Sequence, residues 1–301
     1  MLFGCQYQNI QNSSTLIFEA ILLAKKRVLA FFISLVVFLS LYISIIYYYD
    51  PLRIFHKPFV YKEYLQRNMR LQAAGIINTW EFDSIILGSS MLENTSAREA
   101  SEYLGGSFVN ISIYGSDFFE RSIVLSYALK RKSIKKVLYS LDYFGLIDSR
   151  RNINLYNKEL FLNLYDDNIY NDFPIYFNDK YIKCIFSITE QQNCMGDKLD
   201  FDRPNSWYKN PKIKARFGGF ERWLKDTNNR QMKRDFRIIT DSVNEIKKNN
   251  IALDEFKYKK IEESRRYLDE TILAFVRKNP DTKFIMVVPL TCPQNSSQVQ
   301  S

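Results

Sequence analysis

The sequence has few residues of the kinds that hold metals. It contains one histidine, His56, and four cysteines, no two of which form a C-x-x-C pair. Zinc sites and thioredoxin-like redox sites need cysteines or histidines at such short spacings, so we expect neither a metal site nor a cofactor. Glycine and proline are also sparse. Hydrophobic residues, however, make up 46% of the chain, a composition that excludes a disordered protein.

The cysteines leave the redox state open. Cys184 and Cys194 lie ten positions apart in a region without regular patterning. In an oxidising compartment they could form a local disulfide, and otherwise they are two free thiols; the sequence supports both readings equally. Cys5 precedes the apolar segment described below, so it would lie on the other side of a membrane from this pair.

The chain also lacks clustered charge. Its net charge is +9, but the basic residues are spread among acidic ones and never form a run of five or six. Zinc-finger spacings and RRM-like aromatic motifs are absent as well, so nucleic acid is excluded as a partner. A scattered positive excess suits a solvated surface close to an anionic membrane.

The most distinctive feature present is an uncharged apolar run, residues 28–49. A helix needs about 20 apolar residues to cross a bilayer, so this run predicts a single transmembrane helix. Lys25, Lys26 and Arg27 precede it, and Tyr47 to Tyr49 would lie in the headgroup layer. A signal peptide has a shorter apolar core, about 7–15 residues, with a small-residue cleavage site that this sequence lacks.

The charges around this run predict the orientation. The basic residues before it favour a cytoplasmic N-terminal segment, residues 1–27, although Arg53, Lys57 and Lys62 behind the helix reduce the bias. We therefore expect a single-pass protein of the inner (cytoplasmic) membrane whose C-terminal domain lies outside, in the periplasm. Residues 16–24, a shorter apolar stretch, are expected to lie along the membrane interface.

The remainder divides into three parts by pattern. A polar, partly helical connector is predicted at 50–78, an α/β domain at 79–290, and a polar tail at 291–301. Within the domain, residues 145–235 lose the regular pattern and are predicted to be a long insertion with short helices of its own, one near 220–224.

Short apolar strands alternate with helices through the domain, and this alternation predicts a mainly parallel sheet. Ser116 or Asp117 is expected to cap the helix that runs to about residue 129. The predicted strands are residues 83–87, 108–111, 136–141 and 283–288. The later predicted helices are residues 235–248 and 254–277.

Three groups of polar or glycine residues follow these strands, where functional groups of α/β sheets gather. Gly88-Ser89-Ser90 follows the first strand and can present a serine hydroxyl. Asn110 to Gly115 follows the second, and a glycine there lets backbone N–H groups approach an oxyanion. Asp142 follows the third. Each also has a purely structural reading: Ser90 as a helix cap, Gly115 as a turn glycine and Asp142 as a cap or hydrogen-bond acceptor.

The order ILGSS, VNISIYG, LD resembles the SGNH, or GDSL-like, hydrolase superfamily, and within it the membrane-anchored bacterial envelope proteins linked to polysaccharide O-acetylation. The resemblance covers about residues 50–142 and the strand near Pro289. It implies a three-layer, flavodoxin-like fold, with Ser90 as nucleophile, Ser89 in the place of the family's Asp, and Gly115 as oxyanion donor. Asp142 stands near the place of the family's third-block Asn.

The resemblance also indicates which sequence block of the family this chain lacks. The family's last block, Asp-x-x-His, supplies the base that makes a serine nucleophilic. His56 is not in such a block and is read as an exposed residue beside the membrane. We expect a C-terminally truncated or frame-shifted product that has lost this block, which leaves open whether the chain is an active ester hydrolase or O-acetyltransferase.

The resulting hypothesis is a membrane-anchored esterase or O-acyltransferase-type domain acting on acyl groups of a cell-envelope glycan. The residues expected to bind substrate are Ser89, Asn94 and Asn110, with Asn94 one helical turn beyond Ser90. The expected partners are the bilayer, the glycan or acyl ester, and a membrane-bound O-acyltransferase. The alternative is a non-catalytic accessory or glycan-binding protein of the envelope on the same scaffold.

Overall fold

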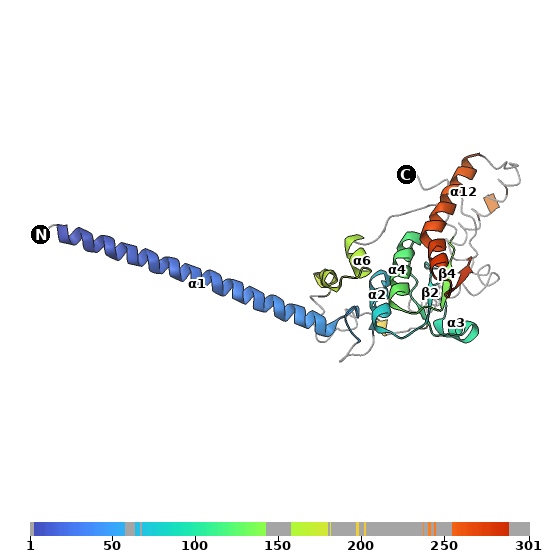
Figure 1. Cartoon of the computed structure of the whole chain (residues 1–301), viewed down its shortest axis with the longest axis horizontal. Helices are drawn as coiled ribbons and strands as arrows, with labels where there is room; N and C mark the ends of the chain where they lie inside the picture. Colours follow the sequence, from blue (N-terminus) through green and yellow to red (C-terminus); the bar gives the residue numbers. More distant parts are fainter. Residues whose placement is uncertain are drawn as a thin grey trace. The chain divides into compact units, whose positions relative to one another are not determined.

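The computed structural model describes residues 3–57, 64–66, 68–142, 158–179, 181, 197–198, 202, 237, 240–241, 244 and 255–288. The chain divides into two compact units, Met1–Asp50 and Pro51–Ser301. Figure 1 shows the first as a single long helix and the second as a sheet with helices around it.

The first unit consists of helix α1, Phe3–Tyr49. Its segment Ile21–Tyr49 is long and apolar enough, by length and composition, to cross a membrane. The helix predicted at 28–49 is therefore confirmed as a helix. Residues 16–24 continue the same helix instead of forming a separate element, because no glycine or proline interrupts the chain there.

The second unit is an α/β domain built on a four-stranded parallel sheet, so the predicted α/β class with a mainly parallel sheet is confirmed. The strands lie in the order β3-β2-β4-β6. All three neighbouring pairs are parallel. The strand bounds are β2, Ser84–Leu87; β3, Phe108–Asn110; β4, Lys136–Ser140; and β6, Lys283–Val287, each inside or matching its predicted range.

Alternate residues of each strand face opposite sides of the sheet, and different helices cover the two sides. Helix α3, Ala97–Leu104, packs its Ala97 and Ala100 on the face that carries Ile86 and Leu138. On the other face, Phe118 of α4 (Phe118–Arg131) contacts the ring of Tyr139. Crossovers of a parallel sheet are right-handed, which places the helix between β2 and β3 and the helix between β3 and β4 on opposite faces.

Helix α2, Met69–Thr79, lies within the stretch predicted as a connector but belongs to the folded unit. Ten of its 11 residues are buried, and it packs against α4. The preceding segment lies directly against it: a Cβ built on Gly75 would stand 1.8 Å from the carbonyl oxygen of Leu52. Gln72 donates to the same carbonyl at 2.9 Å. A glycine is needed at this position for the close approach of two backbones.

The predicted insertion is described only in parts. Its elements are α6, Lys158–Leu164; the 3₁₀ turns η1, Ile169–Asn171, and η2, Phe173–Tyr176; and β5, Asp197–Lys198, which pairs antiparallel with β1, Tyr64–Leu65. Asp202 reaches the start of α3, where its carboxylate accepts a hydrogen bond from the Arg98 N–H at 2.9 Å. The helix predicted at 220–224, the tail 291–301 and the pair Cys184 and Cys194 lie outside the described residues.

The helix predicted at 254–277 is confirmed with one irregularity. It consists of α12, Glu255–Leu268, a π-helical turn η4, Asp269–Leu273, and α13, Ala274–Lys278. The π turn packs against α4. Tyr267, one residue before the end of α12, is buried, and its hydroxyl accepts a hydrogen bond from the Phe119 N–H at 3.0 Å. Of the predicted helix at 235–248, only isolated helical positions are described.

Candidate functional site at the carboxyl ends of the parallel strands

The strand order defines where a site is expected. From β2 the chain crosses to β3 on one side, and from β4 it continues to β6 on the other. The adjacent strands β2 and β4 therefore flank the point where the winding reverses, and ligands of open α/β sheets bind outside the carboxyl ends of the strands at such a point. The residues that follow these two strands are Gly88-Ser89-Ser90 and Leu141-Asp142.

Gly88 holds the first of these turns against its neighbours. A Cβ at this position would lie 2.6 Å from the Ser140 hydroxyl oxygen and 2.9 Å from Leu92, so glycine is required for packing. Its N–H donates to the Ser112 hydroxyl at 3.1 Å. Its carbonyl accepts from the Ile113 N–H at 2.8 Å. The turn after β2 thus lies beside the segment that follows β3.

The two serines of the turn differ in their contacts. Ser89 is buried, and its hydroxyl accepts a hydrogen bond from the Met91 N–H at 3.4 Å. Its own N–H donates to the Ser140 hydroxyl at 3.4 Å. Ser90 is partly exposed, and neither its hydroxyl nor its N–H bonds to any residue that the structure describes. Ser90 is therefore the serine that can meet a substrate.

Asp142 carries the charge at the end of β4. Its Oδ2 lies 2.8 Å from Nη2 of Arg121, which is fully buried on α4. The N–H does not point along this line, so the contact is an ion pair without hydrogen-bond geometry. The Ser140 hydroxyl donates to the same oxygen at 3.0 Å. Within the described part of the chain, the buried Oδ1 of Asp142 has no hydrogen-bond partner.

Arg121 joins this carboxylate to the rest of the site. Its Nη1 donates to the Ser140 carbonyl at 2.7 Å and to the Ser140 hydroxyl at 3.1 Å, and its Nε donates to the Asp117 carbonyl at 3.0 Å. The guanidinium also lies over the rings of Phe118 and Tyr139, at 4.5 and 5.1 Å. Arg121 was not predicted from the sequence, because nothing in its local pattern distinguishes it from the other arginines. It is buried only because α4 packs on the sheet.

A second carboxyl group lies at the same edge. Asp117 is the N-cap of α4 and accepts a hydrogen bond from the Glu120 N–H at 2.7 Å, which decides between the two predicted caps. Burial raises the pKa of Asp117 to about 6, against the lowering effects of that hydrogen bond and of the Arg121 charge. The neighbouring Ser116 hydroxyl donates to the Gly88 carbonyl at 3.4 Å. A carboxyl with this pKa can accept a proton near neutral pH.

The turn after β3 contributes a backbone N–H group, that of Gly115. Gly115 has φ +61°, and the Ser116 N–H bonds to the Ile113 carbonyl at 3.1 Å. The Gly115 N–H donates to none of the described residues. A four-residue turn with positive φ at its third position is a type II turn, for which glycine is the usual residue. Gly115 thus offers an unpaired backbone donor beside the turn that carries Ser90.

The two predicted substrate-binding asparagines hold different places. Asn110 is buried, and its amide donates to the carbonyls of Leu92, Glu93 and Thr95 at 2.8, 3.5 and 2.9 Å. Its Oδ1 accepts from the Ser112 N–H at 3.0 Å. Asn110 therefore fixes the segment that follows Ser90. Asn94 lies within that segment and is half-buried.

His56 lies at the opposite end of the domain from these groups. Helix α4 starts at the site and runs away from it, and α2 runs alongside in the same direction, since an ion pair joins their first turns. Asn78, near the end of α2, accepts from the Tyr127 hydroxyl at 2.8 Å and donates to the Ile54 carbonyl at 3.0 Å. His56 lies two residues after Ile54 in the sequence and therefore at the same end of α2. Its imidazole is not the base of this site.

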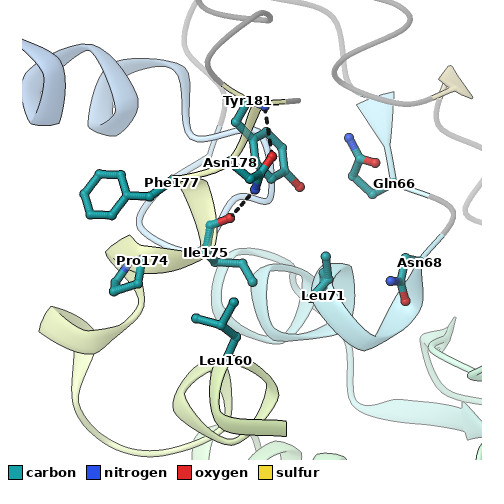
Figure 2. Close-up of a pocket in the computed structure, with 9 residues that line it drawn as sticks. All are labelled: Gln66, Asn68, Leu71, Leu160, Pro174, Ile175, Phe177, Asn178 and Tyr181. Carbon is teal, nitrogen blue, oxygen red and sulfur yellow. Dashed lines mark hydrogen bonds between the residues drawn. The ribbon is translucent and has the colours of Figure 1, made fainter. Parts of the chain in front are cut away.

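A separate pocket of about 290 Å³ lies between α2 and the segment that contains α6 and η2 (Figure 2). Figure 2 shows Leu71 on α2 facing Leu160 and Ile175 across it. The amides of Asn68 and Asn178 add polarity, and the lining that the structure describes has no charged side chain. The described lining contains no carboxylate or imidazole that could act as a general base, so we place the candidate chemistry at the strand ends.

Among the residues that the structure describes, no three histidine, cysteine or carboxylate side chains come together in a way that could hold a metal ion. No family model, curated protein or solved structure matches this chain. The candidate site is accordingly defined by its own geometry: Ser90, Gly115 and Asp142 follow neighbouring parallel strands, and Arg121 joins the last of them to α4.

Proposed function

We propose that this chain is a membrane-anchored, serine-centred acyl-transfer domain with an SGNH-like fold, acting on acyl groups of a cell-envelope glycan. The observation that carries the proposal is the place of Ser90. Its hydroxyl bonds to none of the described residues and follows the first parallel strand at the reversal point of the sheet, and the turn that contains Gly115 bonds to the neighbouring Gly88. The SGNH-like fold and the glycan substrate in this proposal are inferred from the sequence resemblance.

The groups at the site divide the chemistry between them. The hydroxyl of Ser90 attacks the acyl carbonyl, and the N–H groups of Ser90 and Gly115 stabilise the oxygen that becomes negative. A serine also needs a proton acceptor, and His56 lies elsewhere. We assign that role to the carboxyl of Asp117, whose raised pKa makes it a better acceptor than an ordinary aspartate. Asp142, paired with Arg121, supplies fixed negative charge at the same edge.

In this proposal α1 is the anchor. The segment Ile21–Tyr49 has the length and composition that a spanning helix needs. The basic residues just before the apolar run favour a cytoplasmic N-terminus, which places the α/β domain on the outer side, where the glycan is. An enzyme anchored in the inner membrane with its domain on the outer side would be in contact with envelope polymers and would not be released from the cell.

A fluorophosphonate probe, which phosphonylates activated serines, tests the proposal on the full chain in detergent. We expect mass spectrometry to place the label on Ser90, and we expect Ser90→Ala to lose the label and at least about 1,000-fold of p-nitrophenyl acetate hydrolysis. Ser133→Ala is the matched control, because Ser133 is exposed at the amino end of β4. Labelling and turnover that persist in Ser90→Ala would eliminate the proposal.

A non-catalytic, glycan-binding role is the second candidate. The observation that favours it is the position of the only histidine, since no imidazole can serve Ser90 from the far end of α2. A comparison of wild type with Ser90→Ala distinguishes the catalytic candidate from the non-catalytic one. An unlabelled wild type, together with equal calorimetric affinity of wild type and Ser90→Ala for envelope polysaccharide, supports binding without catalysis.

A further inference from the structure

Arg70 and Glu120 form a buried, bidentate ion pair between α2 and α4. Nε donates to Oε1 at 3.0 Å and Nη2 donates to Oε2 at 2.8 Å, and the two side chains are 5% and 1% exposed. This fork uses one edge of the guanidinium and fixes its plane. The remaining nitrogen, Nη1, donates to the carbonyl oxygen of Tyr114 at 2.9 Å.

That carbonyl belongs to the peptide unit whose N–H is on Gly115. The peptide is planar and trans, so its carbonyl oxygen and its N–H point in opposite directions. A donor that holds the Tyr114 carbonyl on one side therefore fixes the direction of the Gly115 N–H on the other.

This peptide is also the one that distinguishes a type II turn from a type I turn. Tyr114 has negative φ and Gly115 has φ +61°, the signs of a type II turn. Rotation of the central peptide by about half a turn would convert it to type I and reverse the Gly115 N–H. Glycine permits both forms. The sequence of the turn alone does not hold the peptide in one orientation.

We propose that Arg70 is a positioning residue that locks the Tyr114–Gly115 peptide so that its N–H faces the oxyanion formed at Ser90. This inference rests on the proposed function and deepens it. The guanidinium also polarises the peptide it holds, because hydrogen bonds in a chain strengthen one another in a buried site. The Gly115 N–H becomes a stronger donor through the charge of Arg70.

Three neighbouring residues hold Arg70 in place. The Asn68 side chain accepts from the Arg70 N–H at 3.2 Å, and the Tyr165 hydroxyl donates to the Arg70 carbonyl at 2.8 Å. Glu120 fixes the side chain, as described above. A residue needed only to pair with Glu120 would not require a second contact to a turn carbonyl, so the Nη1 contact points to control of the turn.

Isotope labelling reads this peptide directly. Tyr followed by Gly occurs once in the sequence, at Tyr114-Gly115. Full-length protein in detergent, labelled with ¹³C-carbonyl tyrosine and ¹⁵N-glycine, therefore gives a single carbonyl–amide correlation, that of this peptide. A carbonyl that accepts from a guanidinium resonates downfield, and loss of that bond moves its signal upfield.

Two variants separate the contact from the ion pair. Arg70→Met with Glu120→Met removes the lock without leaving a buried charge, a change that proteins often tolerate. Glu120→Gln keeps Arg70 and its bond to Tyr114. We expect the carbonyl signal to move upfield in the double variant and to stay near its wild-type position in Glu120→Gln. An unmoved signal in the double variant overturns the proposal.

Kinetics then test the catalytic consequence. An oxyanion donor acts in the transition state, so the double variant should lose about 10- to 100-fold in kcat for an acetyl ester with KM within about twofold. A loss confined to KM, or none, overturns the positioning role. Absence of any Ser90-dependent turnover in wild type defeats the proposed function instead, while the carbonyl signal still decides whether Arg70 locks the peptide.

Discussion

The guanidinium of Arg121 and the carboxylate of Asp142 lie 2.8 Å apart and join α4 to the carboxyl end of β4. Arg121 is fully buried, and its other nitrogens bond to Ser140 and to the Asp117 carbonyl. One interaction network thus links the helix that follows β3 with the strand beside β2. The edge of the sheet where Ser90 lies is held by charge as well as by packing.

Removal of one partner of this pair should be costly. Arg121→Met leaves Asp142 charged and without its cation, and we expect a loss of about 3–5 kcal/mol in the free energy of unfolding, measured with denaturant and tryptophan fluorescence. Arg265→Met, at a side chain 78% exposed, is the control and should change stability by less than about 0.5 kcal/mol. Equal effects of the two substitutions would contradict the role of the pair.

Asn110 should matter for structure more than for substrate contact. Its amide satisfies the carbonyls of Leu92 and Thr95, which follow the Ser90 turn. Asn110→Ala leaves these buried groups unpaired, so we expect it to destabilise the domain by about 2–4 kcal/mol. Faster amide hydrogen exchange in residues 91–95 is the local readout. A variant with normal stability and exchange but raised KM would instead indicate direct binding.

Asp117 should make stability depend on pH between about 4 and 6. Its folded pKa of about 6 lies above the ordinary 3.8, so the folded state keeps the proton while the unfolded chain loses it. Stability should therefore fall as pH rises through this window, by about 1–2 kcal/mol for a partly exposed group. Asp117→Asn keeps the helix cap and removes the titration.

The measurement is the difference in unfolding free energy between wild type and Asp117→Asn at pH 4, 5, 6 and 7. We expect this difference to change most between pH 4 and 6 and to level off near pH 7, because half of the folded carboxyl groups still carry the proton at pH 6. A difference that is the same at every pH would show that the carboxyl of Asp117 titrates normally.

The anchor can be tested by charge. Val36→Arg with Val37→Arg places two cations in the middle of the apolar segment, at about 2.5–3.5 kcal/mol each for insertion into a bilayer. We expect the chain to leave the membrane pellet after alkaline extraction. Val36→Leu with Val37→Leu should remain in the pellet. If the wild-type chain itself is extracted, Ile21–Tyr49 does not span the membrane.

Local patterns in the sequence were enough for the elements of the fold. The apolar run from residue 28, the short strands that end at Gly88 and Asp142, and the cap before α4 all follow from hydrophobic periodicity and capping residues that are neighbours in the chain. The same patterns predicted that Ser90, Gly115 and Asp142 follow parallel strands. For the connector at 50–78 they were less informative, because α2 is buried on nearly all sides and shows no amphipathic stripe.

The strand order and the contacts between distant residues follow from long-range packing. Arg70 reaches Tyr114 and Glu120, and Arg121 reaches Asp142, across separations that no local pattern specifies. This packing also places His56 at the far end of α2. A long, flexible cation can pair with many partners in an unfolded chain, and the packing of α2 and α4 on the sheet selects one. Hydrophobic periodicity therefore predicts which groups end the strands. Long-range packing selects the partners that these groups have among the described residues.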